Sequence, residues 1–206
     1  NTLTWQEKIV LVLVSLLFIL QPIEFIDQRV PVFALAVCGI WILVFHKHIY
    51  RQAGFLQFAA VMALLGLPSI FSLYNTHNLE QTIKIAFGVP LFFVAGTTIY
   101  SLLCNRKATR ILATVIALTS SIWIFDGMVQ FIVGKDIFGI PLYSGKVSGP
   151  FTNTHMGILL TVMLPVTLKW FKKYGWFPQL MYMACLGLVI VWSDTRTAWI
   201  TYLVAI

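Results

Sequence analysis

Charged residues are scarce in this chain. Only 10% of its 206 residues are Asp, Glu, Lys or Arg, whereas 59% are hydrophobic. A soluble domain carries about 25% charged residues, so the composition excludes an ordinary soluble core and indicates an integral membrane protein in a lipid bilayer. The net charge of +7 is spread over short segments between apolar runs. That distribution favours a membrane topology signal and argues against nucleic acid as a partner.

Cysteines and recognisable cofactor motifs are also few. Cys38, Cys104 and Cys185 lie in or beside apolar segments without pairing or metal-ligand spacing, which is typical of small buried apolar side chains. The chain has no carboxylate cluster for a divalent metal, no Walker-type glycine loop and no nucleotide fingerprint. We therefore expect no cofactor, and any chemistry would use a pre-activated substrate without metal or ATP.

Long apolar runs are what the chain has in abundance. A helical span needs roughly 20 such residues, and no repeat or low-complexity linker separates the runs. The fold class expected is all-α, a polytopic transmembrane helical bundle with about seven complete helices plus a truncated eighth, forming a single domain over 1–206. The candidate spans are Trp5–Pro22, Val30–Phe45, Phe55–Tyr74, Thr82–Leu103, Ala108–Val133, His155–Trp170, Trp176–Trp192 and one that opens at Thr197.

The two ends of the sequence carry a further expectation. The chain begins at Asn1 without a methionine and stops at Ile206 inside an apolar run. We expect it to be the amino-terminal part of a longer protein. The first apolar run lacks a small-residue cleavage site, so it is interpreted as a retained helix and not as a signal peptide.

Basic residues set the expected orientation. With a cytoplasmic amino terminus and alternating loops, nine of the 14 basic residues and one of the seven acidic residues fall inside, which gives +8 inside against −1 outside. This asymmetry agrees with the positive-inside rule. Tryptophans near the predicted span ends fit an aromatic belt at the headgroup level; they are Trp5, Trp41, Trp170, Trp176, Trp192 and Trp199.

Two polar islands interrupt the apolar pattern, and both fall on the predicted outer side. The longer is Gly134–Met156, whose glycines and prolines deny it a regular helix. The shorter is Ser193–Arg196, between the last two predicted helices. We expect these islands to lie on one side of a membrane and to face one site.

Arg196 is the most informative charge in these islands. A guanidinium at the end of a span is costly without a partner, and two interpretations remain open. It is either an interfacial arginine that snorkels to water or pairs with Asp194, or an anion clamp whose planar donor fork matches phosphate oxygens. We select it as the first substrate-binding candidate.

The longer island supplies the other substrate-binding candidates, which are Asp136, Lys146, Asn153 and His155. Asn153 is at least as well explained as the cap of the following helix, where free backbone N–H groups favour an anion. His155 is equally consistent with a first-turn residue that faces headgroups. Asp126, with Gln130 one helical turn further on, is an intramembrane carboxylate and hence a functional candidate, although a hydrated local cavity explains it as well.

Four segments together resemble one family. They are QFIVGKDIFG at 130–139, SGPFTNTHMG at 148–157, LP at 164–165 and SDTRTA at 193–198. This series resembles the O-antigen ligase/polymerase superfamily, which includes lipopolysaccharide O-antigen ligases, O-antigen polymerases and pilin glycan transferases. The resemblance covers most of 130–206, and upstream it rests on helix count and topology.

The resemblance implies a GT-C-like membrane enzyme of the bacterial inner membrane with a periplasmic active site. Such enzymes transfer a glycan from an undecaprenyl-diphosphate carrier to an acceptor such as lipid A-core. Arg196 matches the family's serine-x-x-arginine-like position, which implies a diphosphate contact. The family's general-base histidine lies on a large periplasmic loop expected beyond Ile206. Where the family often has two asparagines around a proline, this chain has Asn153, Thr154 and His155, so the catalytic residue is left unassigned.

Three functions are therefore carried forward. The first is O-antigen ligase-like glycan transfer in lipopolysaccharide biosynthesis, and the second is polymerisation of O-antigen or exopolysaccharide by a member of the same superfamily. The third, from another class, is a small-solute or anion transporter in which kinked helices and Asp126 line a path.

Overall fold

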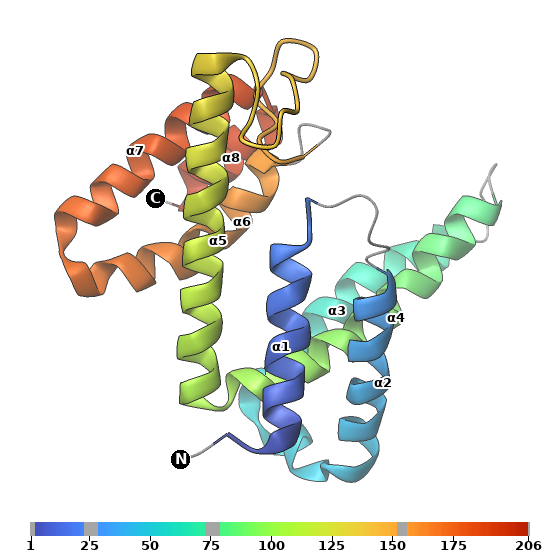
Figure 1. The fold of residues 1–206 in the computed structure, drawn as a ribbon. Helices are drawn as coiled ribbons and strands as arrows, with labels where there is room; N and C mark the ends of the chain where they lie inside the picture. Colours follow the sequence, from blue (N-terminus) through green and yellow to red (C-terminus); the bar gives the residue numbers. More distant parts are fainter. Residues whose placement is uncertain (1–2, 23–28, 73–78, 152–155, 206) are drawn as a thin grey trace. The chain divides into compact units, whose positions relative to one another are not determined.

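The computed structural model describes residues 3–22, 29–72, 79–151 and 156–205 of the chain (Figure 1). In these residues the secondary structure is mostly helical, in agreement with the all-α prediction. The α-helices are α1 (Trp5–Ile19), α2 (Arg29–Phe45), α3 (Ala53–Ser72), α4 (Leu79–Leu103), α5 (Arg106–Val133), α6 (Met156–Phe171), α7 (Trp176–Ser193) and α8 (Arg196–Ala205). Two short 3-10 helices are η1 (Lys47–Arg51) and η3 (Lys172–Tyr174).

Each predicted apolar span corresponds to one of these helices, with ends that differ by a few residues. Among the described residues, four helices are long and apolar enough to cross a membrane, within Gly54–Ser72, Thr82–Leu103, Arg106–Val133 and Trp176–Ser193. By length and composition, these helices indicate a membrane protein. The described parts of α1, α2 and α6 have 15, 17 and 16 residues, and α8 has ten. Four of the predicted spans are thus supported by helix length, and the other predicted spans stay predictions.

The chain divides into two compact units. Unit 1 comprises residues 1–17 and 27–109, and unit 2 comprises residues 18–26 and 110–206. The expected single transmembrane domain stays a prediction, because compactness of the two parts does not decide it. The units are described separately below.

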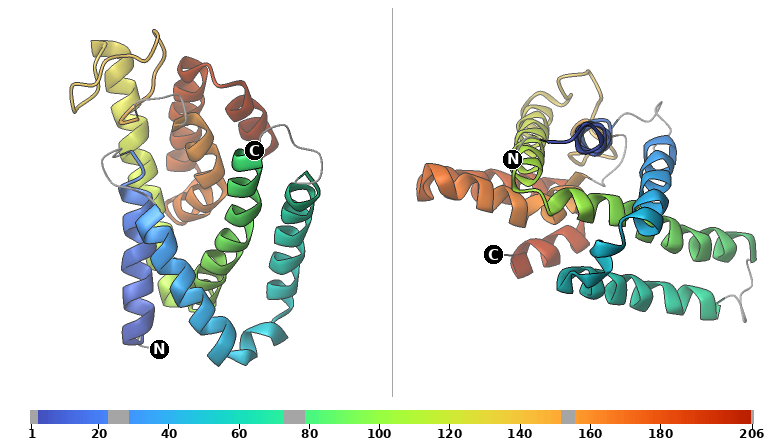
Figure 2. Two further views of the ribbon diagram at one scale, coloured as in Figure 1. Left: turned by 90° about the vertical axis from the view of Figure 1, so that its right-hand side faces the viewer. Right: turned by 90° about the horizontal axis from the view of Figure 1, so that it is seen from below.

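Unit 1 is built around α4, which packs against both α2 and α3 (Figure 2). The α2–α4 approach requires a glycine, because a Cβ on Gly39 would lie 1.9 Å from the carbonyl oxygen of Val94. The Thr98 hydroxyl donates a hydrogen bond of 2.7 Å to the backbone oxygen of Leu35 across the same interface. Between helices in a membrane the hydrophobic effect gives no driving force, because lipid tails are as apolar as the side chains. Close backbone packing and hydrogen bonds between helices stabilise their association instead.

Unit 2 contains α6, which packs against α7 and α8. Its core is aliphatic, with Leu160, Leu164 and Leu186 fully buried. The three-residue η3 turns the chain between α6 and α7, so these helices form an antiparallel hairpin. One end of the hairpin therefore carries η3, and the other carries the start of α6 and the α7–α8 turn.

Proline lies inside three helices, as the sequence indicated, at Pro68, Pro90 and Pro165. Each helix continues across its proline. A proline inside a helix removes one backbone hydrogen bond, and neighbouring helices can compensate for that loss in a membrane.

Candidate functional site

The chain leaves α5 through a glycine and then forms two tight turns. The N–H of Gly134 donates to the Gln130 carbonyl oxygen at 2.8 Å, and Gly134 has a φ of +81°, which is the left-handed conformation that ends many helices. Isolated antiparallel bridges then pair Lys135 with Pro141 and Tyr143 with Lys146. Residues 134–151 are called the α5–α6 loop below.

Gln130 fixes this loop on the end of α5. Its side chain is fully buried, and its amide oxygen accepts two hydrogen bonds of 2.8 Å from the N–H groups of Ser148 and Gly149. Its amide nitrogen donates to the carbonyl oxygens of Ile140 and Pro141 at 3.3 and 3.2 Å. One amide therefore satisfies backbone groups at both turns of the loop, which makes it the main positioning residue.

Two carboxylates also hold the loop. An oxygen of Asp126, on α5, accepts a hydrogen bond of 2.8 Å from the N–H of Ile137. An oxygen of Asp136 accepts one from the N–H of Ile140. Both side chains are buried, at 1% and 5% exposure. Asp126 and Asp136 thus shape the loop from within.

The α7–α8 turn is the second polar segment. Asp194 ends α7 in the left-handed conformation, with a φ of +50°. Ser193 is fully buried, and its hydroxyl donates to the Ile190 carbonyl oxygen at 2.9 Å. Gly157 at the start of α6 packs closely on this turn, because a Cβ there would lie 2.9 Å from the Ser193 hydroxyl oxygen. The turn is consequently closely packed within unit 2.

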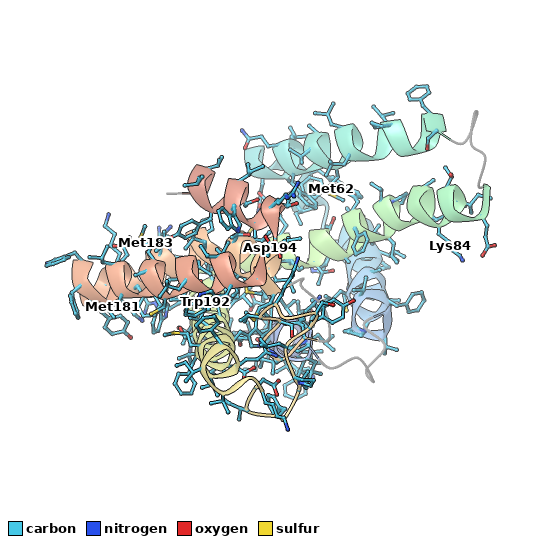
Figure 3. The ribbon with its side chains drawn as sticks, turned by 90° about the horizontal axis from the view of Figure 1, so that it is seen from above. Met62, Lys84, Met181, Met183, Trp192 and Asp194 are labelled. Atoms are coloured by element: carbon cyan, nitrogen blue, oxygen red, sulfur yellow. The ribbon has the colours of Figure 1, made fainter. Side chains whose placement is uncertain are left out.

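The loop and the turn contact each other directly. Lys146 Nζ lies 2.7 Å from Asp194 Oδ2, and the N–H of Val147 donates to the Trp192 carbonyl oxygen at 3.2 Å. Trp192 also stacks on Phe131 of α5, with ring centroids 3.7 Å apart. Trp192 and Asp194 occupy the same end of α7, while Met181 and Met183 lie toward its other end (Figure 3). The described parts of the two polar islands therefore contact each other, whereas a common site and their side of the membrane stay predictions.

Of the described charged residues at this junction, Lys146 and Asp194 pair with each other, whereas Arg196 does not. The hydrogen bond and charge of Lys146 hold the pKa of the Asp194 carboxyl below its ordinary value of 3.8, and Arg196 adds a weaker effect in the same direction. Arg196 is exposed at the first position of α8. Within the described residues its guanidinium has no hydrogen bond or ion pair. Among the described residues Arg196 forms no ion pair with Asp194, whose Oδ2 contacts Lys146 instead. The exposure of Arg196 agrees both with an interfacial arginine that snorkels to water and with an anion clamp.

The predicted site residues fall into three groups. Lys146 and Arg196 are both near Asp194, since Lys146 contacts its carboxylate and Arg196 weakly lowers its pKa. Asp136 lies buried in the same loop, so its predicted substrate contact stays a prediction. Asn153 and His155 lie outside the described residues. In the described part of the chain, no group of three or more His, Cys, Asp or Glu side chains is arranged to hold a metal ion.

Gln130 is the residue whose role the sequence did not reveal. The sequence placed it one turn from Asp126 but gave it no function. The signal that was available is a glutamine in an apolar helix, one turn before a glycine-rich segment. A buried amide must find hydrogen-bond partners, and an irregular loop next to it offers them.

Comparison with known proteins finds no counterpart. No protein-family model, no curated protein and no solved structure matches this chain. The resemblance to the O-antigen ligase/polymerase superfamily accordingly stays a prediction.

Proposed function

We propose that this chain belongs to a membrane transferase that moves a glycan from an undecaprenyl-diphosphate carrier to an acceptor, such as lipid A-core, at the periplasmic face of the inner membrane. The fold would be a GT-C-like polytopic bundle. The observation that carries the proposal is the exposed guanidinium of Arg196, which has no described partner at the start of α8. The four-segment resemblance adds to it.

The chemistry of a lipid diphosphate suits this arrangement. Negative charge builds on the diphosphate as the glycosidic bond breaks, and a fixed cation placed there stabilises the transition state more than the ground state. Arginine offers a planar donor fork that binds phosphate oxygens bidentately. The first N–H groups of α8 and its helix dipole favour an anion at the same place.

The Lys146–Asp194 ion pair also contributes to the proposed diphosphate site. An unpaired carboxylate two residues from Arg196 would repel a diphosphate. Lys146 neutralises Asp194 at 2.7 Å, so the positive charge of Arg196 remains available. In this proposal the α5–α6 loop forms the wall of the carrier site, with Asn153 and His155 as further contacts. The acceptor hydroxyl also needs a general base within hydrogen-bond reach, and the resemblance implies a histidine beyond Ile206.

The polymerase and transporter alternatives make different demands on the same residues. A polymerase of the superfamily would use the same carrier site with a different acceptor. The transporter alternative needs Asp126 to line a path. Asp126 is 1% exposed and accepts a hydrogen bond from the loop N–H of Ile137, which favours an anchoring role over a path-lining one.

The test replaces Arg196 by alanine and by lysine in the full-length protein and measures glycan transfer to the acceptor in a strain that depends on it. Loss of one fixed oxyanion donor costs about 100-fold or more in rate, so we expect that loss for Arg196→Ala. We expect a smaller loss for Arg196→Lys, which keeps the charge but not the fork. Arg110→Ala is the matched control, since Arg110 is an exposed arginine of the same unit. Near-normal transfer by both Arg196 variants at normal protein levels would contradict the proposal.

A further inference from the structure

The opposite end of the α6–α7 hairpin is basic and aromatic. Residues 169–177, called the α6–α7 basic turn, include three exposed lysines, Lys169, Lys172 and Lys173. No acidic residue occurs in the sequence between Asp136 and Asp194. Among the described residues, none of the three lysines forms an ion pair. Three positive charges thus lie in one short segment, and no described acidic side chain neutralises them.

Aromatic rings accompany these charges. Trp176, Phe177 and Tyr174 are 74%, 59% and 57% exposed. Trp170 is fixed to α5, because its indole N–H donates to the Thr114 hydroxyl at 2.9 Å. Lys173 Nζ lies 4.0 Å from the centroid of this Trp170 ring and 4.6 Å from that of Tyr174. Cation–π contact holds Lys173 in place, which leaves Lys169 and Lys172 as the freer charges.

We infer that the α6–α7 basic turn binds the phosphate headgroups of anionic phospholipids. This inference is independent of the proposed function, because it concerns the other end of the hairpin. Amphipathic rings next to lysines suit the boundary between headgroups and acyl chains. The turn continues directly into apolar surface on α7, where Leu180 and Met181 are 53% and 48% exposed. Because α7 is long and apolar enough to span the membrane, a phospholipid beside it would contact this apolar surface with its acyl chains and the lysines with its phosphate.

The consequence for the molecule is a fixed depth in the membrane. An 18-residue helix such as α7 is about 27 Å long, close to the thickness of the hydrocarbon core. Headgroups bound at the α6–α7 basic turn would therefore set the height of the α7–α8 turn at the far end. The lipid contact positions the hairpin without touching the candidate site.

The experiment is a titration of the purified chain in neutral detergent, followed by native mass spectrometry. Phosphatidylglycerol and phosphatidylcholine with identical acyl chains are the two probes, and the measured quantity is the ratio of their dissociation constants. Each lysine near an anionic surface contributes about fivefold in binding. We expect the wild-type chain to prefer phosphatidylglycerol, and Lys169→Gln combined with Lys172→Gln to lose about 25-fold of that preference.

Two double variants serve as controls. Lys84→Gln with Lys135→Gln removes the same charge from exposed lysines elsewhere and should keep the preference. Lys169→Arg with Lys172→Arg should also keep it, which separates lost charge from lost folding. Equal affinity of the wild-type chain for the two lipids would overturn the inference, and so would an equal loss in the Lys84/Lys135 variant.

Inorganic phosphate and Trp176 complete the test. Inorganic phosphate at the same concentration as phosphatidylglycerol should not displace the lipid, because it cannot use the rings. Displacement would show a simple phosphate site and overturn the inference. Trp176→Ala should weaken both lipids by a similar factor and leave their ratio unchanged, whereas a collapse of the ratio would contradict the assignment of selectivity to the lysines.

Discussion

The two compact units differ in what they bury. Among the described residues, unit 1 has two buried polar side chains, Thr97 and Thr98, and unit 2 has nine. Both threonines of unit 1 bond to helix backbone, one within α4 and one across to α2. In unit 2, by contrast, Gln130, Asp126 and Asp136 bond to an irregular loop. In the described residues, unit 1 therefore buries polar side chains only in helix packing, while unit 2 also uses them to hold an irregular loop.

The largest effect is expected when the polar set of unit 2 is broken at Gln130. Gln130→Leu leaves the N–H groups of Ser148 and Gly149 without their acceptor. An unsatisfied buried donor costs about 1–3 kcal/mol, so we expect a loss of about 3 kcal/mol in local stability. Hydrogen exchange of residues 134–151 should accelerate by about 100-fold or more, since every 1.4 kcal/mol is about tenfold. Thr98→Val is the comparison in unit 1.

Gln130→Glu refines the same experiment. It keeps an acceptor for the two N–H groups but loses the donors to Ile140 and Pro141. Its exchange rates should lie between those of the wild-type chain and Gln130→Leu. Unchanged exchange of the loop in both variants would refute the role of Gln130.

The next effect concerns the packing of unit 1. In Gly39→Ala the new methyl group would lie 1.9 Å from the Val94 carbonyl oxygen. Overpacking of this kind costs about 1–3 kcal/mol, so unit 1 should unfold more easily while the loop of unit 2 exchanges as before. Gly88→Ala is the matched control, because its Cβ would meet only a Phe92 ring atom at 3.9 Å. Thermal unfolding in detergent measures both, and equal stability of the two variants would contradict the close α2–α4 approach.

The smallest effect is the pH response of the Lys146–Asp194 pair. The folded-state pKa of Asp194 is below its ordinary value of 3.8, so the stabilisation from this pair is present above that value. It is lost as the pH falls through the lowered pKa. The contact between loop and turn should therefore be constant at neutral and mildly acidic pH and weaken only below about pH 4.

Lys146→Gln removes the hydrogen bond and the positive charge that lower the pKa of Asp194 most. The titration midpoint of Asp194, followed by carboxyl carbon NMR, should rise toward 3.8 in this variant. It should stay unchanged in Lys84→Gln, which breaks the exposed Lys84–Glu80 pair instead. High salt should shrink the difference, because both partners are exposed. An unshifted midpoint in Lys146→Gln would show that the ion pair does not persist in solution.

Much of the helix pattern could be predicted from the sequence, because apolar runs bounded by charges and glycines define helices locally. The predicted span Ala108–Val133 corresponds to α5, and Trp176–Trp192 corresponds to α7. Residues 134–151 were predicted to be irregular for the same local reason. Four of the predicted spans are supported by the length of their helices in the described residues, and the spans at α1, α2 and α6 stay predictions.

The detail of the candidate site could be predicted only in part. That Lys146, and not Arg196, pairs with Asp194 depends on the path of the α5–α6 loop, and that path depends on Gln130. Amide contacts to backbone 10 to 19 residues away leave no periodic signature. Arg196 could be selected as a candidate because it is the basic residue of a short polar segment between two predicted spans, which the sequence shows without knowledge of its partners.

The central claim is that Arg196 binds a diphosphate at the junction of the α5–α6 loop and the α7–α8 turn. Its most direct test compares the binding of farnesyl diphosphate, farnesyl monophosphate and farnesol to the purified wild-type chain and to Arg196→Ala. We predict that the wild-type chain binds the diphosphate at least about tenfold more tightly than farnesol, and that Arg196→Ala loses most of this preference, as expected for a charge-assisted bidentate contact. Equal binding of the three probes by the wild-type chain, or an undiminished diphosphate preference in Arg196→Ala, would contradict the claim.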